Sequence, residues 1–241
     1  MPSAPQSRKT FEISDSLNRQ LNTYALVAST AGVSVLALAR ASEAKVVYTE
    51  THQVTSSRVP LYIDLNHDGI NDFVLRTTYY VGSSNFVGLN ASGYRNFNNA
   101  VAGRRFSNSG YFFSAASALR AGTRIGPERK FPVNFPMMAE ERFNGVGSQY
   151  SDRGPWAGKG KGVRNRYLGL KFVIQGKIHY GWARLSVTLG HHRQLDDVSG
   201  TLTGYAYETV PNKTIIAGQI TGPDVITVQP ETLGRLARGR K

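Results

Sequence analysis

A nine-residue stretch at positions 64–72, DLNHDGIND, concentrates oxygen-bearing side chains in a chain that is otherwise basic. Asp64, Asn66, Asp68 and Asp72 stand at its positions 1, 3, 5 and 9, and the backbone carbonyl of Ile70 falls at position 7. Calcium is a hard cation that takes roughly six to eight oxygen ligands from carboxylates, amides, backbone carbonyls and water. The spacing therefore predicts a Ca²⁺ site formed by these five residues.

The residues around this stretch decide which kind of calcium loop it would be. Gly69 permits the sharp turn that such a loop needs. An EF-hand would have Glu at the position of Leu75 and helices on both sides, so this class is excluded. The flanks predict strands, and in that context the motif resembles the calcium loops of integrin-type FG-GAP and VCBS repeats, present once. The alternative is an ion-free turn, because Asp, Asn and Gly are common turn formers.

Basic residues dominate the rest of the chain, with 29 Lys and Arg against 16 Asp and Glu. Residues 95–130 contain a run of Arg and Lys in which Glu128 is the only acid, and residues 153–166 are also basic. Such charge attracts anionic polymers, here acidic polysaccharide, lipopolysaccharide or extracellular DNA. The alternative is that the charge serves solubility alone. The candidate anion-binding residues are Arg104, Arg105, Lys159, Lys161, Arg164 and Arg166.

Catalytic patterns are weak in this sequence. There is no cysteine, no HExxH metal motif and no GxSxG nucleophile motif. Glu140, Glu141 and Glu208 could supply the acid pair of a glycosidase, but their separation does not follow from the sequence. We therefore expect a binding or structural protein with no catalytic residues, and the alternative is a secreted hydrolase that acts on polysaccharide.

The elements that must position these residues are predicted to be strands. Residues 167–174 alternate apolar and other side chains with the period of a half-buried strand, and a turn at Gly176 precedes a second strand at 178–189. Further β-branched and aromatic runs occur at 45–51, 59–63, 73–80, 201–209 and 214–217. The pattern predicts a mainly β protein, an antiparallel β-sandwich of jelly-roll-like type.

The middle of the chain has weaker periodicity. Residues 82–166 are rich in Gly, Ser, Asn and Arg, and they predict long loops between the strands of the sandwich. A short helix is expected at 115–121, before Gly122.

The N-terminal 44 residues have the layout of a secretory signal peptide. A basic leader precedes an apolar run at 21–38, and Ser42 and Ala44 form a small-x-small cleavage pattern. We expect cleavage after Ala44 and an extracellular, periplasmic or cell-surface location. The alternative is an uncleaved membrane anchor. The predicted organisation is a signal peptide (1–44), a β-sandwich domain (45–222) and a basic tail (223–241).

A block in the last third of the chain resembles a group of exported bacterial β-rich proteins. It comprises His179-Tyr-Gly-Trp182, Gly204-Tyr-Ala-Tyr-Glu208 and Ile215-Ile-Ala-Gly218. The group is related to proteins that carry a PEP-CTERM sorting tail. The resemblance implies export and a β-rich fold, and it implies no reaction. Residues 229–231 read Gln-Pro-Glu and no apolar run follows them in this sequence, so we do not expect membrane sorting by such a tail.

Overall fold

The structure is a computed structural model that describes residues 45–56, 59–82, 85–94, 98–108, 111–132, 136–144, 149–190 and 198–228. The predicted signal peptide and residues 229–241 of the predicted tail lie outside these ranges, so the expected cleavage and export remain predictions. Within the described ranges we find no helix with the length and hydrophobicity that crossing a membrane requires.

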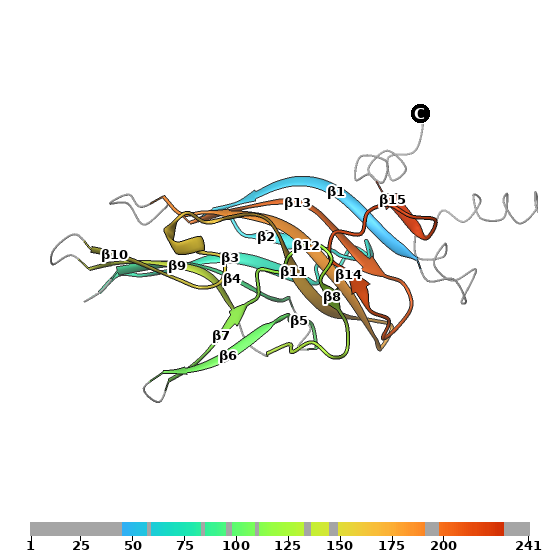
Figure 1. Cartoon of the computed structure of the whole chain (residues 1–241), viewed down its shortest axis with the longest axis horizontal. Helices are drawn as coiled ribbons and strands as arrows, with labels where there is room; N and C mark the ends of the chain where they lie inside the picture. Colours follow the sequence, from blue (N-terminus) through green and yellow to red (C-terminus); the bar gives the residue numbers. More distant parts are fainter. Residues whose placement is uncertain are drawn as a thin grey trace, which may run out of the picture. The chain divides into compact units, whose positions relative to one another are not determined.

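The described strands form two large sheets, which lie as two layers (Figure 1). The first sheet has the order β15 (Val225–Val228), β1 (Val46–Thr55), β13 (Ser199–Glu208), β12 (Lys177–Thr188), β11 (Val163–Ile174) and β5 (Ala100–Val101). The second has the order β2 (Leu61–Ile63), β3 (Phe73–Tyr80), β4 (Asn85–Gly93), β9 (Met137–Asn144), β7 (Tyr111–Ala116) and β6 (Gly103–Asn108), and β10 (Gln149–Arg153) pairs with β9. A short pair, β8 (Arg124–Ile125) and β14 (Ile215–Ile216), and a 3₁₀ turn, η1 (Gly158–Gly160), complete the described elements.

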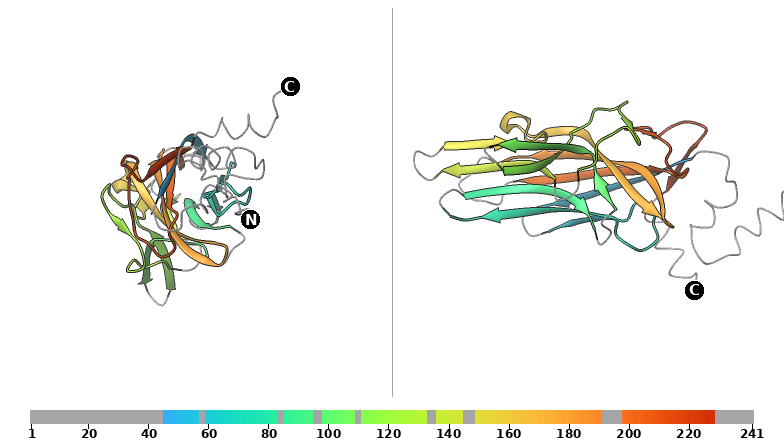
Figure 2. Two further views of the ribbon diagram at one scale, coloured as in Figure 1. Left: turned by 90° about the vertical axis from the view of Figure 1, so that its right-hand side faces the viewer. Right: turned by 90° about the horizontal axis from the view of Figure 1, so that it is seen from below.

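This arrangement confirms the predicted β-sandwich. The strands of both sheets run in similar directions (Figure 2, right), as in sheets that pack face to face with aligned strands. Pairing is mostly antiparallel, and β2–β3–β4 and β11–β12–β13 form consecutive hairpins. The predicted turn at Gly176 is a two-residue hairpin loop, since Ile174 pairs with Lys177 and both Gln175 and Gly176 have positive φ, at 49° and 80°.

Three local expectations were wrong. The region predicted as long loops contains β4 to β10 despite its weak alternation. There β6 pairs with β7 and β9 with β10 as local hairpins, while β4 pairs with the more distant β9. The helix expected at 115–121 does not form, and residues 115–116 end β7 instead. Residues 225–228, assigned to the basic tail, form β15, which pairs in parallel with β1 at the edge of the first sheet.

The main hydrophobic core lies between the two sheets. Leu168, Leu170 and Phe172 alternate along β11 and are fully buried there, as the sequence pattern predicted. The ring of Phe172 lies 6.5 Å from that of Phe73 in the second sheet and 5.6 Å from that of Tyr207 in the first. Phe172 therefore joins the two layers of the sandwich.

A second apolar cluster covers the outer face of the first sheet. Tyr180 and Trp182 share a face of β12 and are buried with Ile125 of β8 and Ile215 of β14. The expected core role of these two aromatic residues is confirmed. Leu119 exchanges two backbone hydrogen bonds of 3.0 Å with Tyr167, which attach the segment before β8 to this sheet. The outer segment is therefore held firmly enough to carry a site.

His179 provides a pH-dependent contribution to the stability of the sandwich. Its Nδ1 lies 2.9 Å from the backbone oxygen of Glu208, and burial lowers its pKa below the ordinary 6.5. Protonation therefore favours the unfolded chain, so this contribution is intact above pH 6.5 and is lost as the pH falls from there through the folded-state pKa. We expect His179→Gln to flatten the pH dependence of the free energy of unfolding, measured by urea titration between about pH 5 and 8. An unchanged pH profile in the variant would contradict this assignment.

Candidate functional site

The acidic loop, residues 64–72, connects β2 to β3 as the sequence predicted. Ile63 pairs with Phe73, and the backbone N–H of Asp72 donates to the Ile63 carbonyl at 2.8 Å, which closes the loop at its base. Gly69 has a φ of 84°, a conformation that side chains with a Cβ rarely adopt, so the expected sharp turn is confirmed. His67 also has a positive φ, at 61°.

Backbone donors orient two of the carboxylates in this loop. The carboxylate of Asp64 accepts hydrogen bonds from the backbone N–H groups of Asp68 at 3.2 Å and Gly69 at 2.8 Å. One oxygen of Asp68 accepts the N–H of Ile70 at 2.8 Å, and the other accepts the side-chain amide of Asn66 at 3.0 Å. A carboxylate has about four acceptor positions, so each of these two groups retains capacity for a cation.

Asp72 has a different environment at the base of the acidic loop. It is buried, and it accepts hydrogen bonds from the Leu65 N–H at 2.8 Å and from the Asn99 side-chain amide at 3.4 Å. Burial raises the pKa of Asp72 to about 7, and the negative charges of Asp64 and Asp68 raise it as well. The nearest polar neighbours of Asp72 therefore fasten the loop to the body of the sandwich.

The amide oxygen of Asn66 is the least satisfied acceptor in the loop. It is buried and has no hydrogen-bond partner among the described residues, although such buried acceptors are usually paired. Across the same residues, no three His, Asp or Glu side chains converge as a metal-binding group. A cation in this loop would therefore need the amide and backbone oxygens of Asn66 and Ile70 in addition to carboxylates.

Contacts with the first sheet hold the acidic loop in place. Thr49 Oγ1 of β1 lies 2.7 Å from His67 Nε2, and the His67 ring lies 5.8 Å from that of Tyr205 in β13. Burial lowers the pKa of His67 and raises that of Tyr205 to about 12. Asn99 links the loop to β11 of the first sheet. Its side-chain amide donates to Asp72, and its side-chain oxygen accepts the Val173 N–H at 3.1 Å. The loop thus bridges both layers of the sandwich.

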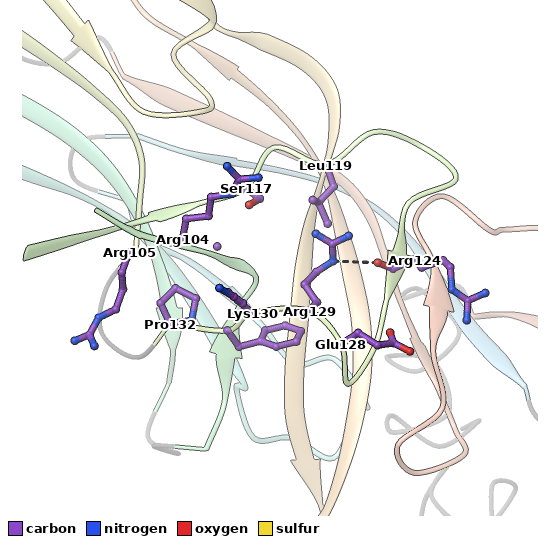
Figure 3. Close-up of a pocket in the computed structure, with 11 residues that line it drawn as sticks. Arg104, Arg105, Ser117, Leu119, Arg124, Glu128, Arg129, Lys130 and Pro132 are labelled. Carbon is purple, nitrogen blue, oxygen red and sulfur yellow. Dashed lines mark hydrogen bonds between the residues drawn. The ribbon is translucent and has the colours of Figure 1, made fainter. Parts of the chain in front are cut away.

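A second candidate site is a basic pocket with a cavity volume of about 1060 Å³ (Figure 3). It lies between the start of β6 and the segment that runs from β7 through β8 to Pro132. Its cationic lining residues are Arg104, Arg105, Arg124, Arg129 and Lys130. Glu128 is the one acid in the described lining, and Gly103, Ser117, Leu119, Phe131 and Pro132 provide the remaining surface.

Backbone contacts bring the two walls of the basic pocket together. The N–H of Gly103 donates to the Lys130 carbonyl at 3.0 Å, and the N–H of Ser117 donates to the Ala102 carbonyl at 2.9 Å. Gly103 is needed at this approach, since a Cβ there would lie 2.2 Å from the carbonyl oxygen of Ala115. Residues far apart in the sequence therefore share one concave surface.

Within the part of the chain that the structure describes, no ion pair neutralises the cations of the basic pocket. Arg142–Glu140 and Lys213–Glu208 are ion pairs of the described residues, and both lie outside the pocket lining. Arg129 donates from Nε to the Arg124 carbonyl at 3.0 Å, which leaves its two terminal nitrogens for a ligand. An anion entering the pocket would therefore meet several charged donors that no described carboxylate occupies in an ion pair.

In Figure 3 these cations have two orientations. Arg104 extends toward Ser117 and Arg129 toward Leu119, while Arg105 and Arg124 point outward on opposite sides. An inner pair of guanidinium groups and an outer pair on the flanks suit a ligand with more than one negative charge.

The structure divides the predicted anion-binding residues into two groups. Arg104 and Arg105 line the basic pocket, whereas Lys159, Lys161, Arg164 and Arg166 do not. Lys159 lies in η1, Lys161 directly follows it, and Arg164 and Arg166 lie at the start of β11; the first three are exposed and Arg166 is half-buried. The cations that join Arg104 and Arg105 instead come from residues 124–130. Their signal in the sequence was the basic run with Glu128 as its only acid.

The three glutamates that could form a glycosidase pair do not share a pocket with these residues. Glu140 and Glu141 belong to β9 in the second sheet, and Glu208 ends β13 in the first. Glu140 is ion-paired with Arg142. None of the three lines the basic pocket.

The fold and these two sites define the protein as a two-layer β-sandwich with an acidic loop on one strand connection and a basic pocket beside its outer segment. Comparison with family models, curated proteins and solved structures gives no match.

Proposed function

We propose that the protein is an exported, calcium-stabilised β-sandwich that binds anionic polymers or glycans at the cell surface or outside the cell. The observation that carries this proposal is the basic pocket, a concave surface lined by five cationic side chains and one acid among the described residues. Like charges held together without counterions repel one another, and a bound polyanion relieves that repulsion. The role that fits best is binding or structural.

The acidic loop supplies the calcium part of the proposal. The proposed ligands are the side chains of Asp64, Asn66, Asp68 and Asp72 and the carbonyl of Ile70. Two features support them: the carboxylates of Asp64 and Asp68 are oriented by backbone donors, and the amide oxygen of Asn66 is buried without a partner among the described residues. Bound calcium would neutralise the aspartates and hold together the loop that joins β2 to β3.

The proposed location rests on the N-terminal sequence alone. The basic leader, the apolar run at 21–38 and the small residues before position 45 have the layout of an export signal. Calcium at millimolar concentration is common outside cells, so even a weak site of this kind would be occupied there.

Binding of the full-length protein to a soluble polyanion tests the proposal. We expect saturable binding to heparin and to single-stranded DNA at low salt, with log K falling linearly as log salt rises. If three to five of the pocket cations contact the polymer, the slope for a single strand should be roughly −2 to −3.5. Neutral dextran of similar length is the control ligand and should not bind. Absence of binding at low salt, or an affinity that salt leaves unchanged, would contradict the proposed function.

A further inference from the structure

We infer that the basic pocket takes a glycan chain whose sugars carry carboxylate or sulfate groups, with one acidic group held between Arg104 and Arg129. The inference rests on the proposed function and narrows its ligand from anionic polymers in general to acidic polysaccharide. Three properties of the pocket support it: its concave form, the placement of its cations and its apolar lining.

The concave form of the pocket selects against duplex DNA. A volume of about 1060 Å³ is at the upper end for small-molecule sites, so the pocket has room for more than one sugar ring. Duplex DNA presents its phosphates on a convex cylinder and would contact the rim. It could reach the outward-pointing Arg105 and Arg124, but it would leave the inner guanidinium groups of Arg104 and Arg129 without an anion.

The two orientations of the cations match a chain with repeating charge. A carboxylate or sulfate between Arg104 and Arg129 would receive charge-assisted hydrogen bonds from both guanidinium groups. Acidic groups on the preceding and following sugars would then face Arg105 and Arg124, which point away from the centre on opposite sides. A single small anion would use only the inner pair.

The apolar lining suits the C–H surfaces of sugar rings. Leu119, Phe131 and Pro132 lie among the cations, and Ser117 offers a hydroxyl to a sugar hydroxyl. The Phe131 ring is supported by the Tyr180 ring at 5.8 Å and by Lys171 Nζ at 5.6 Å from its centroid. Single-stranded nucleic acid usually stacks successive bases on several aromatic side chains. Phe131 is the one aromatic side chain in the described lining, which favours a glycan.

The test compares matched oligomers by calorimetry with the full-length protein. The ligands are a tetramer of galacturonic acid, a heparin tetrasaccharide, oligo-dT of equal charge to each, and neutral galactan. We expect Arg104→Gln combined with Arg129→Gln to weaken glycan binding by about tenfold or more, because charged hydrogen bonds are lost. Lys159→Gln combined with Lys161→Gln removes the same charge outside the pocket and should change affinity by less than about threefold.

A single variant distinguishes loss of binding from misfolding, and the panel of ligands distinguishes the glycan assignment from the broader proposed function. Arg104 is exposed, so the single Arg104→Gln variant should melt like the wild type and still bind more weakly. If the Arg104→Gln/Arg129→Gln and Lys159→Gln/Lys161→Gln double variants lost glycan affinity equally, the pocket assignment would be overturned and the proposed function would stand. Tighter or equal binding of oligo-dT would overturn the glycan assignment in the same way. Failure of every anionic ligand, long heparin included, would overturn both. Binding of only the carboxylated or only the sulfated tetramer supports the inference and identifies the acidic group.

Discussion

Adding calcium should raise the melting temperature of the protein by roughly 5–11 °C when free calcium is a hundredfold above Kd. A ligand that binds only the folded state stabilises it by about 2.7 kcal/mol at that concentration, and 1 kcal/mol shifts the melting temperature of a chain of this size by about 2–4 °C. Magnesium should substitute poorly, because it requires tighter octahedral geometry and releases water reluctantly. The measurement is thermal melting after EDTA treatment, repeated with added calcium or magnesium.

Two substitutions in the acidic loop sharpen this test. Asn66→Ala removes the buried amide oxygen that lacks a partner among the described residues, so it should reduce the calcium response strongly. Asn71→Ala makes the same chemical change in the same loop at a position outside the proposed ligand set, so its calcium response should match the wild type. A wild-type melting temperature that ignores calcium, or equal responses in the two variants, would show that residues 64–72 form a turn without an ion.

Replacing Phe172 by Ala should lower the free energy of unfolding by about 3–5 kcal/mol. The side chain is fully buried between the sheets and contacts Phe73 in one layer and Tyr207 in the other. Truncation removes apolar surface from the core and leaves a cavity that the paired strands close poorly, because their backbone hydrogen bonds hold them in register. The expected fall in melting temperature is roughly 6–20 °C.

Phe113→Ala is the matched control for this prediction. Phe113 lies on β7 and is 43% exposed, so the same truncation removes less buried surface there and should cost clearly less stability. Both free energies of unfolding can be measured by urea titration. Similar costs for Phe113→Ala and Phe172→Ala would contradict the placement of Phe172 at the centre of the sandwich.

Features set by near neighbours in the chain were predictable from the sequence. The alternation in residues 167–174 identified β11 and its buried face, and the Gln175-Gly176 turn identified the β11–β12 hairpin. The acidic loop was found between two strands with Gly69 at its sharp turn. In each case the information lies within about ten residues, where strand period and turn conformation follow from side-chain shape and backbone preference.

Features that depend on distant partners were decided by the tertiary structure. Weak alternation concealed β4, β5 and β8, which pair with β9, β11 and β14 far along the chain. Asp72 appeared equivalent to Asp64 and Asp68 in the motif, yet packing buries it beside Asn99. Likewise β15 needs the free edge of β1 to form at all.

The basic pocket is the clearest example of this division. The sequence determined that the chain is strongly basic and that residues 95–130 hold many of its cations. Only the folded chain decided that Arg104 shares a cavity with Arg129 while Lys159 does not. That choice depends on the backbone contact between Gly103 and Lys130 and on the docking of Leu119 beside Tyr167. Charge is a property of composition, whereas the convergence of charges is set by strand register and by which segment covers which face of a sheet.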